Sequence, residues 1–168
     1  MAIFNRAVVS LPGRERIARH LHDGQVFIHA TAEETGGVLG MWETFSAPGT
    51  GPAPHMHTRE TEVFRVIAGA YRFWCGNEVI DAPLGTTVVL PPNVPHAWKN
   101  ISDATGRMMA VVTPGGFEHF FMELERTGAN TPAAIRSVQE RFGLVDVEME
   151  VELYDQDRHL AVYRSGEG

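Results

Sequence analysis

The sequence is short of the features that mark secreted, membrane-spanning and nucleic-acid-binding proteins. It has one cysteine, Cys75, so no disulfide can form within the chain. No apolar run approaches the roughly 18 residues of a transmembrane helix, and the N-terminus lacks the charged and apolar segments of a signal peptide. The 14 basic residues are outnumbered by 21 acidic ones, and the net charge of -7 disfavours nucleic acid and anionic membranes as partners. We therefore expect a cytoplasmic protein with a small-molecule partner.

What is present is a mostly β pattern followed by a helical one. Runs with a period of two residues, separated by Gly, Pro and Asn turns, predict strands from residue 25 to residue 113. The period then changes, because Phe117, Phe120, Phe121 and Leu124 follow the spacing of an amphipathic helix. A second helix is predicted from a cap at Thr131 and continues to residue 142. We expect the two helices to cover the β structure or to form a dimer contact.

The two ends of the chain differ in sequence pattern from the predicted core between them. Residues 1–23 are weakly patterned and predict an N-terminal arm, in which residues 14–22 could form a short helix. Residues 144–168 predict an acidic strand and tail, because apolar residues alternate with glutamates from Val147 to Leu153. We expect a core at 24–115 and a helical extension at 116–143. Unpaired sheet edges favour a homodimer. The sequence leaves open whether the last strand pairs within the chain or with a second copy across a dimer.

The first group of candidate metal-binding residues lies between Gly49 and Gly69. His55 and His57 are two residues apart, so in an extended strand their imidazoles point to the same face. Glu62, five residues further on, could add a carboxylate from the start of the next strand. Imidazole and carboxylate together suit a first-row transition metal. A His-x-His pair alone is a weak signal, so the pair needs a partner elsewhere in the chain.

That partner lies about thirty residues on. Gly85, Pro91, His96 and Asn100 are spaced as in the second of two motifs that define the cupin superfamily, and the preceding block fits the first motif. The sequence departs from the second motif only at Asn93, where the family usually has glycine, and Asn tolerates positive φ better than most residues. The chain is therefore identified by resemblance as a cupin over roughly residues 25–115.

The resemblance implies an all-β fold, a double-stranded β-helix or jelly-roll barrel, here with two C-terminal helices. It also implies one divalent metal ion, held by His55, His57, Glu62 and His96. Four protein ligands would leave an octahedral metal two positions for water, dioxygen or substrate. The ligand types do not choose between Fe, Ni, Mn, Cu, Co and Zn.

Within the superfamily the chain resembles single-domain bacterial cupins of the quercetin 2,3-dioxygenase-like type, through segments 54–57, 62–69, 91–98 and 113–118. By that resemblance, Glu62 is also the catalytic base that deprotonates the substrate. Alternation places Phe64, Phe73 and Trp98 near the metal, as substrate-pocket residues or as plain core. We expect a metal-dependent dioxygenase that acts on an aromatic or enol substrate. A non-redox isomerase or polyketide-type cyclase, and a binding cupin without catalysis, are the alternatives.

Overall fold

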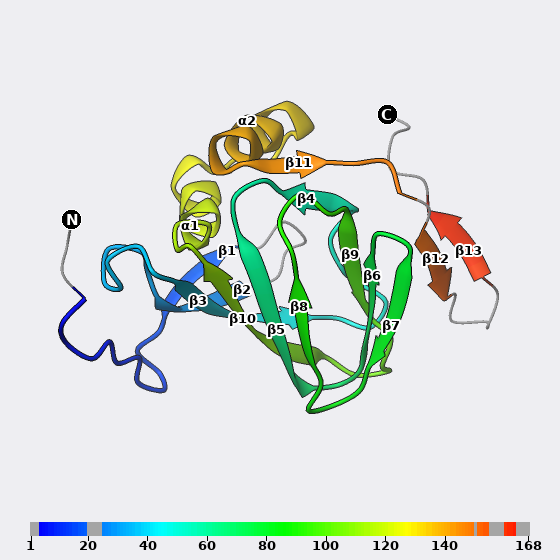
Figure 1. Cartoon of the computed structure of the whole chain (residues 1–168), viewed down its shortest axis with the longest axis horizontal. Helices are drawn as coiled ribbons and strands as arrows, with labels where there is room; N and C mark the ends of the chain where they lie inside the picture. Colours follow the sequence, from blue (N-terminus) through cyan, green and yellow to red (C-terminus); the bar gives the residue numbers. More distant parts are fainter. Residues whose placement is uncertain (1–3, 20–24, 150, 155–159, 164–168) are drawn as a thin grey trace.

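Two antiparallel sheets face each other and enclose the core (Figure 1). The computed structural model describes residues 4–19, 25–149, 151–154 and 160–163. The larger sheet has the order β1-β2-β3-β10-β5-β8. Its strands are β1 (Arg16–Arg19), β2 (Gln25–Ala30), β3 (Gly40–Ser46), β10 (Gly106–Thr113), β5 (Thr61–Ala68) and β8 (Thr87–Leu90). This confirms the predicted all-β, double-stranded β-helix class.

The smaller sheet carries all three histidines of the predicted metal site on two neighbouring strands. Its order is β11-β4-β9-β6-β7. The strands are β11 (Leu144–Asp146), β4 (His55–His57), β9 (His96–Asn100), β6 (Tyr71–Cys75) and β7 (Glu78–Ala82). A separate two-stranded antiparallel sheet is formed by β12 (Val151–Tyr154) and β13 (Leu160–Tyr163).

Alternation along the strands decides which side chains fill the space between the sheets. In β10, every second residue from Gly106 to Val112 is buried, and β2 alternates in the same way. The fully buried side chains of the core include Phe73, Tyr71 and Met108. Because both sheets direct bulky apolar residues inward, the hydrophobic effect closes the barrel.

The turn before β9 depends on an unusual residue. Asn93 has a φ of +61°, and it is the one non-glycine residue in the described part of the chain with positive φ. Asn93 stands where the cupin motif usually has glycine. The positive φ explains this choice, because Asn adopts the left-handed region at a lower cost than most other residues. This turn delivers His96 to the start of β9.

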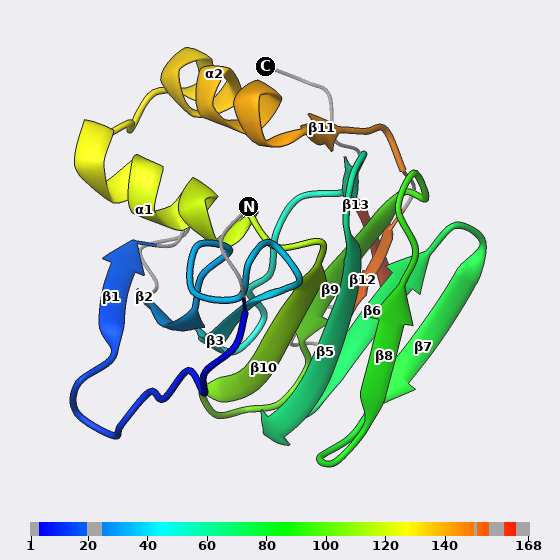
Figure 2. The ribbon, with the colours of Figure 1, turned by 60° about the vertical axis from the view of Figure 1, so that its left-hand side comes forward.

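Two helices cover one end of the sheets (Figure 2). Helix α1 (Glu118–Thr127) buries Phe120, Phe121 and Leu124, the face predicted from their spacing. Helix α2 (Pro132–Phe142) begins at Thr131, whose side chain accepts a hydrogen bond from the Ala134 amide at 3.3 Å. The prediction of two C-terminal helices is confirmed.

The structure differs from the sequence prediction at the two ends. Arg16–Arg19, for which a short helix was allowed, pairs with β2 as an edge strand. The predicted strand from Val147 to Leu153 is only partly confirmed, because residues 147–149 are not strand and strand resumes at Val151 in β12. Met149 instead packs on Trp74 and Ala97 of the smaller sheet. The boundaries of the arm, core, extension and tail stay predictions.

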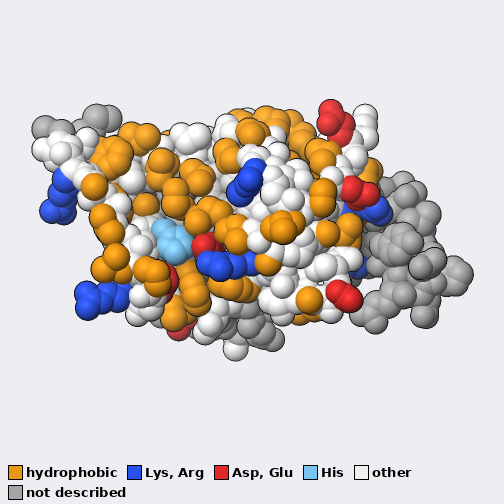
Figure 3. Space-filling model, turned by 90° about the horizontal axis from the view of Figure 1, so that it is seen from below, with side chains coloured by type: hydrophobic (Ala, Val, Ile, Leu, Met, Phe, Trp, Pro, Cys, Tyr) orange, Lys and Arg blue, Asp and Glu red, His pale blue; other side chains and the backbone are white. Residues whose placement is uncertain are grey.

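Large apolar side chains are exposed on strands at the sheet edges. Ile17 on β1, Val79 on β7 and Val89 on β8 are 57%, 60% and 60% exposed. Hydrophobic side chains are also spread over much of the face seen in Figure 3, with charged side chains between them. Among the described residues, no helix is both long and apolar enough to cross a membrane.

Candidate metal centre

Three strands bring the four predicted ligand residues to one point inside the barrel. His55 and His57 come from β4, Glu62 from β5 and His96 from β9, with His55 and His96 directly opposite each other. One ligand atom from each residue lies within 4.8 Å of the others. Glu62 Oε2 lies 3.0 Å from His96 Nε2 and 3.4 Å from His57 Nε2. The cluster therefore has the dimensions of a site for a single ion.

Backbone carbonyls fix the protonation of two of the histidines. His55 Nδ1 lies 2.9 Å from the Ala53 carbonyl oxygen, and His96 Nδ1 lies 2.9 Å from the Val94 carbonyl oxygen. A carbonyl oxygen only accepts, so each Nδ1 carries the proton and donates it. Each Nε2 is then left with a free lone pair. This is the tautomer in which a histidine binds a metal through Nε2.

Burial and charge keep two of the four residues, His55 and Glu62, in their metal-binding forms. Burial, together with the nearby imidazoles of His96 and His57, lowers the pKa of His55 to about 3. Burial raises the pKa of the Glu62 carboxyl, but its interactions with His57 and His96 outweigh that effect and lower the pKa to about 2. At neutral pH the site therefore offers a neutral imidazole at His55 and a carboxylate at Glu62.

The donor set has the chemistry of a cation site. Glu62 Oε2 and His96 Nε2 are both buried, and neither has a hydrogen-bond partner. An unprotonated Nε2 and a carboxylate oxygen are both acceptors, so at 3.0 Å they repel unless a cation or a proton lies between them. Three imidazoles and one carboxylate fit a divalent transition metal. These residues therefore fit the metal that the sequence resemblance implies.

The cluster opens into a largely aromatic cavity of about 480 Å³. Phe64 and Trp98, two of the predicted pocket residues, line it. Phe73 does not: it is fully buried behind Phe64, with ring centroids 5.6 Å apart. The alternation of the sequence correctly predicts that the Phe73 side chain points into the barrel. It does not predict how far that side chain lies from the cavity. The other aromatic lining residues, which the sequence did not indicate, are Trp42, Phe117, Phe120 and Phe121.

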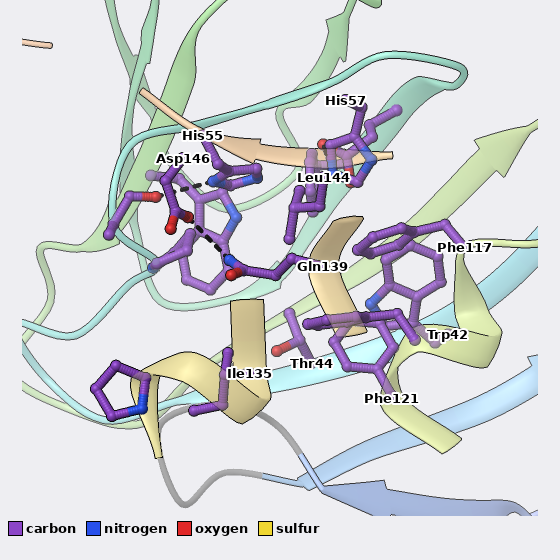
Figure 4. A pocket seen from close by; sticks show the side chains of 17 residues that line it. Trp42, Thr44, His55, His57, Phe117, Phe121, Ile135, Gln139, Leu144 and Asp146 are labelled. Carbon is purple, nitrogen blue, oxygen red and sulfur yellow. Dashed lines mark hydrogen bonds and ion pairs between the residues drawn. The ribbon is translucent and has the colours of Figure 1, made fainter. Parts of the chain in front are cut away.

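The cavity wall combines the barrel with the C-terminal extension. Trp42, Phe117 and Phe121 gather on one side, and Gln139 reaches from α2 toward Asp146 beside His55 (Figure 4). The Gln139 amide donates to Asp146 Oδ1 at 2.8 Å, and so ties α2 to β11. Strand β11 in turn pairs with β4, with Asp146 opposite His55. The extension is therefore part of the site.

Charge is scarce on the lining. Apart from the histidines, the ionisable lining residues are Glu62 and Asp146, and none of the described lysines and arginines lines the cavity. A negatively charged substrate would therefore find no cationic side chain among the described lining residues. A neutral, flat molecule would find rings on several sides.

A family model of the cupin domain matches residues 43–112. The matched segment holds all four predicted metal-binding residues, and over it the chain is similar to a cupin domain. Among curated proteins, it is 33% identical over 70 residues to the quercetin 2,3-dioxygenase of Bacillus subtilis (strain 168). That match covers 42% of this chain and about a fifth (20%) of the length of the dioxygenase.

Solved structures support the same fold. KdgF from Halomonas sp. aligns with a TM-score of 0.60 at 16% identity, covering 68% of this chain and 99% of that chain. An RmlC-like cupin from Shewanella frigidimarina NCIMB 400 aligns with a TM-score of 0.58 at 14% identity, covering 70% of this chain and 99% of the other. At these identities the likeness concerns the fold alone.

Proposed function

We propose that this protein is a metal-dependent cupin dioxygenase that acts on a neutral aromatic or enol substrate, in the manner of quercetin 2,3-dioxygenases. The observation that carries the proposal is the aromatic cavity, without any cationic side chain among its described lining residues, directly over the His and Glu cluster. The limited similarity to the Bacillus subtilis enzyme points in the same direction.

Four residues of this chain would bind the metal ion. His55, His57, Glu62 and His96 would hold the ion, with Nε2 atoms and a carboxylate oxygen facing it. A bound transition metal supplies Lewis acidity and, where it is redox-active, electron exchange with dioxygen.

Glu62 would also act as the base. Its carboxylate, held ionised by the surrounding histidines, can accept the proton of an acidic enol hydroxyl placed within hydrogen-bond reach. Phe64 and Trp98 would hold the ring of the substrate against the site, and burial of the cluster would limit access of bulk water.

Oxygen consumption with a matched substrate pair tests this proposal. Protein loaded separately with Fe(II), Mn(II), Co(II), Ni(II) or Cu(II) is mixed with 3-hydroxyflavone, and with flavone, which lacks the acidic 3-hydroxyl. We expect uptake of dioxygen with 3-hydroxyflavone alone, and none from zinc-loaded protein. Binding without uptake for every redox-active metal would contradict the dioxygenase, and would leave the non-redox enzyme or the binding cupin.

We also propose that the protein is a cytoplasmic homodimer. Exposed apolar residues on edge strands, such as Ile17 and Val89, would be covered in a symmetric pair. Light scattering coupled to size exclusion tests the pairing, and a monomeric mass at micromolar concentration contradicts it.

A further inference from the structure

The third histidine of the cluster differs from the other two in what holds its outer nitrogen. His55 and His96 each donate to a backbone carbonyl, whereas His57 Nδ1 faces the carboxylate of Glu60, with Oε2 at 3.4 Å. Both residues are buried, with His57 1% and Glu60 5% exposed. Among the described residues, neither of the two facing atoms has a hydrogen-bond partner, so their contact is an ion pair.

A second buried carboxylate beside the cluster needs an explanation, because an unpaired buried charge is costly. Glu118 provides a comparison within the same molecule. Its buried carboxylate accepts hydrogen bonds from the amides of Ala32 at 2.6 Å and Gly116 at 2.8 Å, so it serves as a structural clip. Glu60 Oε2 has no such amide donor, and the group it faces is a metal-ligand histidine.

We propose that Glu60 is a positioning residue that orients His57 and strengthens it as a metal ligand. This inference rests on the metal centre of the proposed function. A carboxylate that receives the Nδ1 proton leaves Nε2 free to face the ion, and its negative charge makes the imidazole a better donor. Glu60 and Glu62 together also balance the two positive charges of a divalent ion in a buried site.

An isosteric substitution separates charge from shape. Glu60→Gln keeps an oxygen acceptor for Nδ1 but removes the negative charge. Glu78→Gln makes the same chemical change at an exposed residue of β7 and is the matched control. The readouts are metal affinity, by competition with a chelator, and the reduction potential of the iron-loaded protein, with circular dichroism of the metal-free proteins as the check on folding.

We expect Glu60→Gln to weaken metal binding about 10- to 100-fold. The reduction potential should shift to more positive values, because a nearby negative charge stabilises the oxidised ion. Glu78→Gln should change neither. Wild-type affinity together with an unchanged potential in Glu60→Gln would overturn the proposal.

Two further results keep the test decisive. In cobalt-loaded wild-type protein, His57 should give an exchange-protected, hyperfine-shifted Nδ1 proton signal. Absence of that signal overturns the role of Glu60 even if Glu60→Gln does not fold. A wild-type protein that binds no metal at all would refute the proposed metal centre itself, whereas normal metal binding unaffected by Glu60→Gln would refute only this inference.

Discussion

Single residues set the chemistry of the site through the partners of their outer atoms. At His55 and His96, one backbone carbonyl two residues earlier in the chain fixes the tautomer. The spacing is local, so the loop before each strand determines the protonation state of its histidine. At His57, where the partner is a side chain, the same task depends on Glu60.

Tyr71 gives a prediction at this scale. Its hydroxyl is fully buried and lies 2.6 Å from Ser46 Oγ, and burial raises its pKa although the Ser46 hydrogen bond opposes the shift. Tyr71→Phe should cost about 1 kcal/mol at pH 7, because Ser46 loses its partner. Urea unfolding measures this free energy.

The pH dependence of that difference follows from the raised pKa. The folded state keeps Tyr71 neutral, so its stabilisation is complete below the unfolded value of about 10 and is lost as the pH rises toward the folded value. Wild-type stability should therefore fall more steeply than that of Tyr71→Phe between about pH 9 and pH 11. Parallel curves would contradict the burial argument.

Among the elements, α1 is anchored by one carboxylate. Glu118 is fully buried and bonds the amides of Ala32 and Gly116, and Gly40 leaves room for it because a side chain there would collide with the carboxylate. Glu118→Ala should lower the free energy of unfolding by about 3 kcal/mol, since two charge-assisted hydrogen bonds are lost. The exposed Glu125→Ala on the same helix should change it by less than about 0.5 kcal/mol. If denaturant titration gave the same loss of unfolding free energy for both variants, the proposed role of Glu118 in anchoring α1 would be wrong.

Helix α2 gives a second prediction, because it forms part of the cavity wall. Ile135 lines the cavity, whereas Ser137 on the same helix is exposed and does not. Ile135→Trp should weaken anaerobic binding of 3-hydroxyflavone at least about tenfold by occupying ligand space, a loss of roughly 1.4 kcal/mol. Metal content should stay unchanged. Ser137→Trp is the control, and calorimetric titration is the measurement. Unaltered binding by Ile135→Trp would place the ligand elsewhere.

The elements also explain which parts of the site could be read from the sequence. The His-x-His pair, Glu62 and His96 were accessible, because strand alternation and motif spacing describe them locally. Strand β11 was missed, since three residues carry little periodicity and its partner β4 is distant in the chain. Trp42 and Phe121 were missed as lining residues because only tertiary packing brings β3 and α1 to the same cavity.

For the whole molecule, the barrel and the extension form one site. The alignments with KdgF and with the RmlC-like cupin cover 68% and 70% of this chain. In this chain α1, α2 and β11 supply part of the cavity wall, including Phe121, Ile135 and Leu144. The barrel would therefore hold the ion, while the extension would shape the space for the substrate. This division agrees with the principle that a common fold acquires its activity from the site built on it.

Metal content tests this account most directly. The protein, purified without added metal, is analysed by mass spectrometry of its elements beside His57→Ala and the control His29→Ala, whose histidine belongs to neither candidate metal cluster of the described residues. We predict close to one first-row divalent metal per chain in the wild type and in His29→Ala. His57→Ala should be metal-free, with an unchanged circular dichroism spectrum. A wild-type protein that neither carries nor takes up metal, or full occupancy in His57→Ala, would contradict the account.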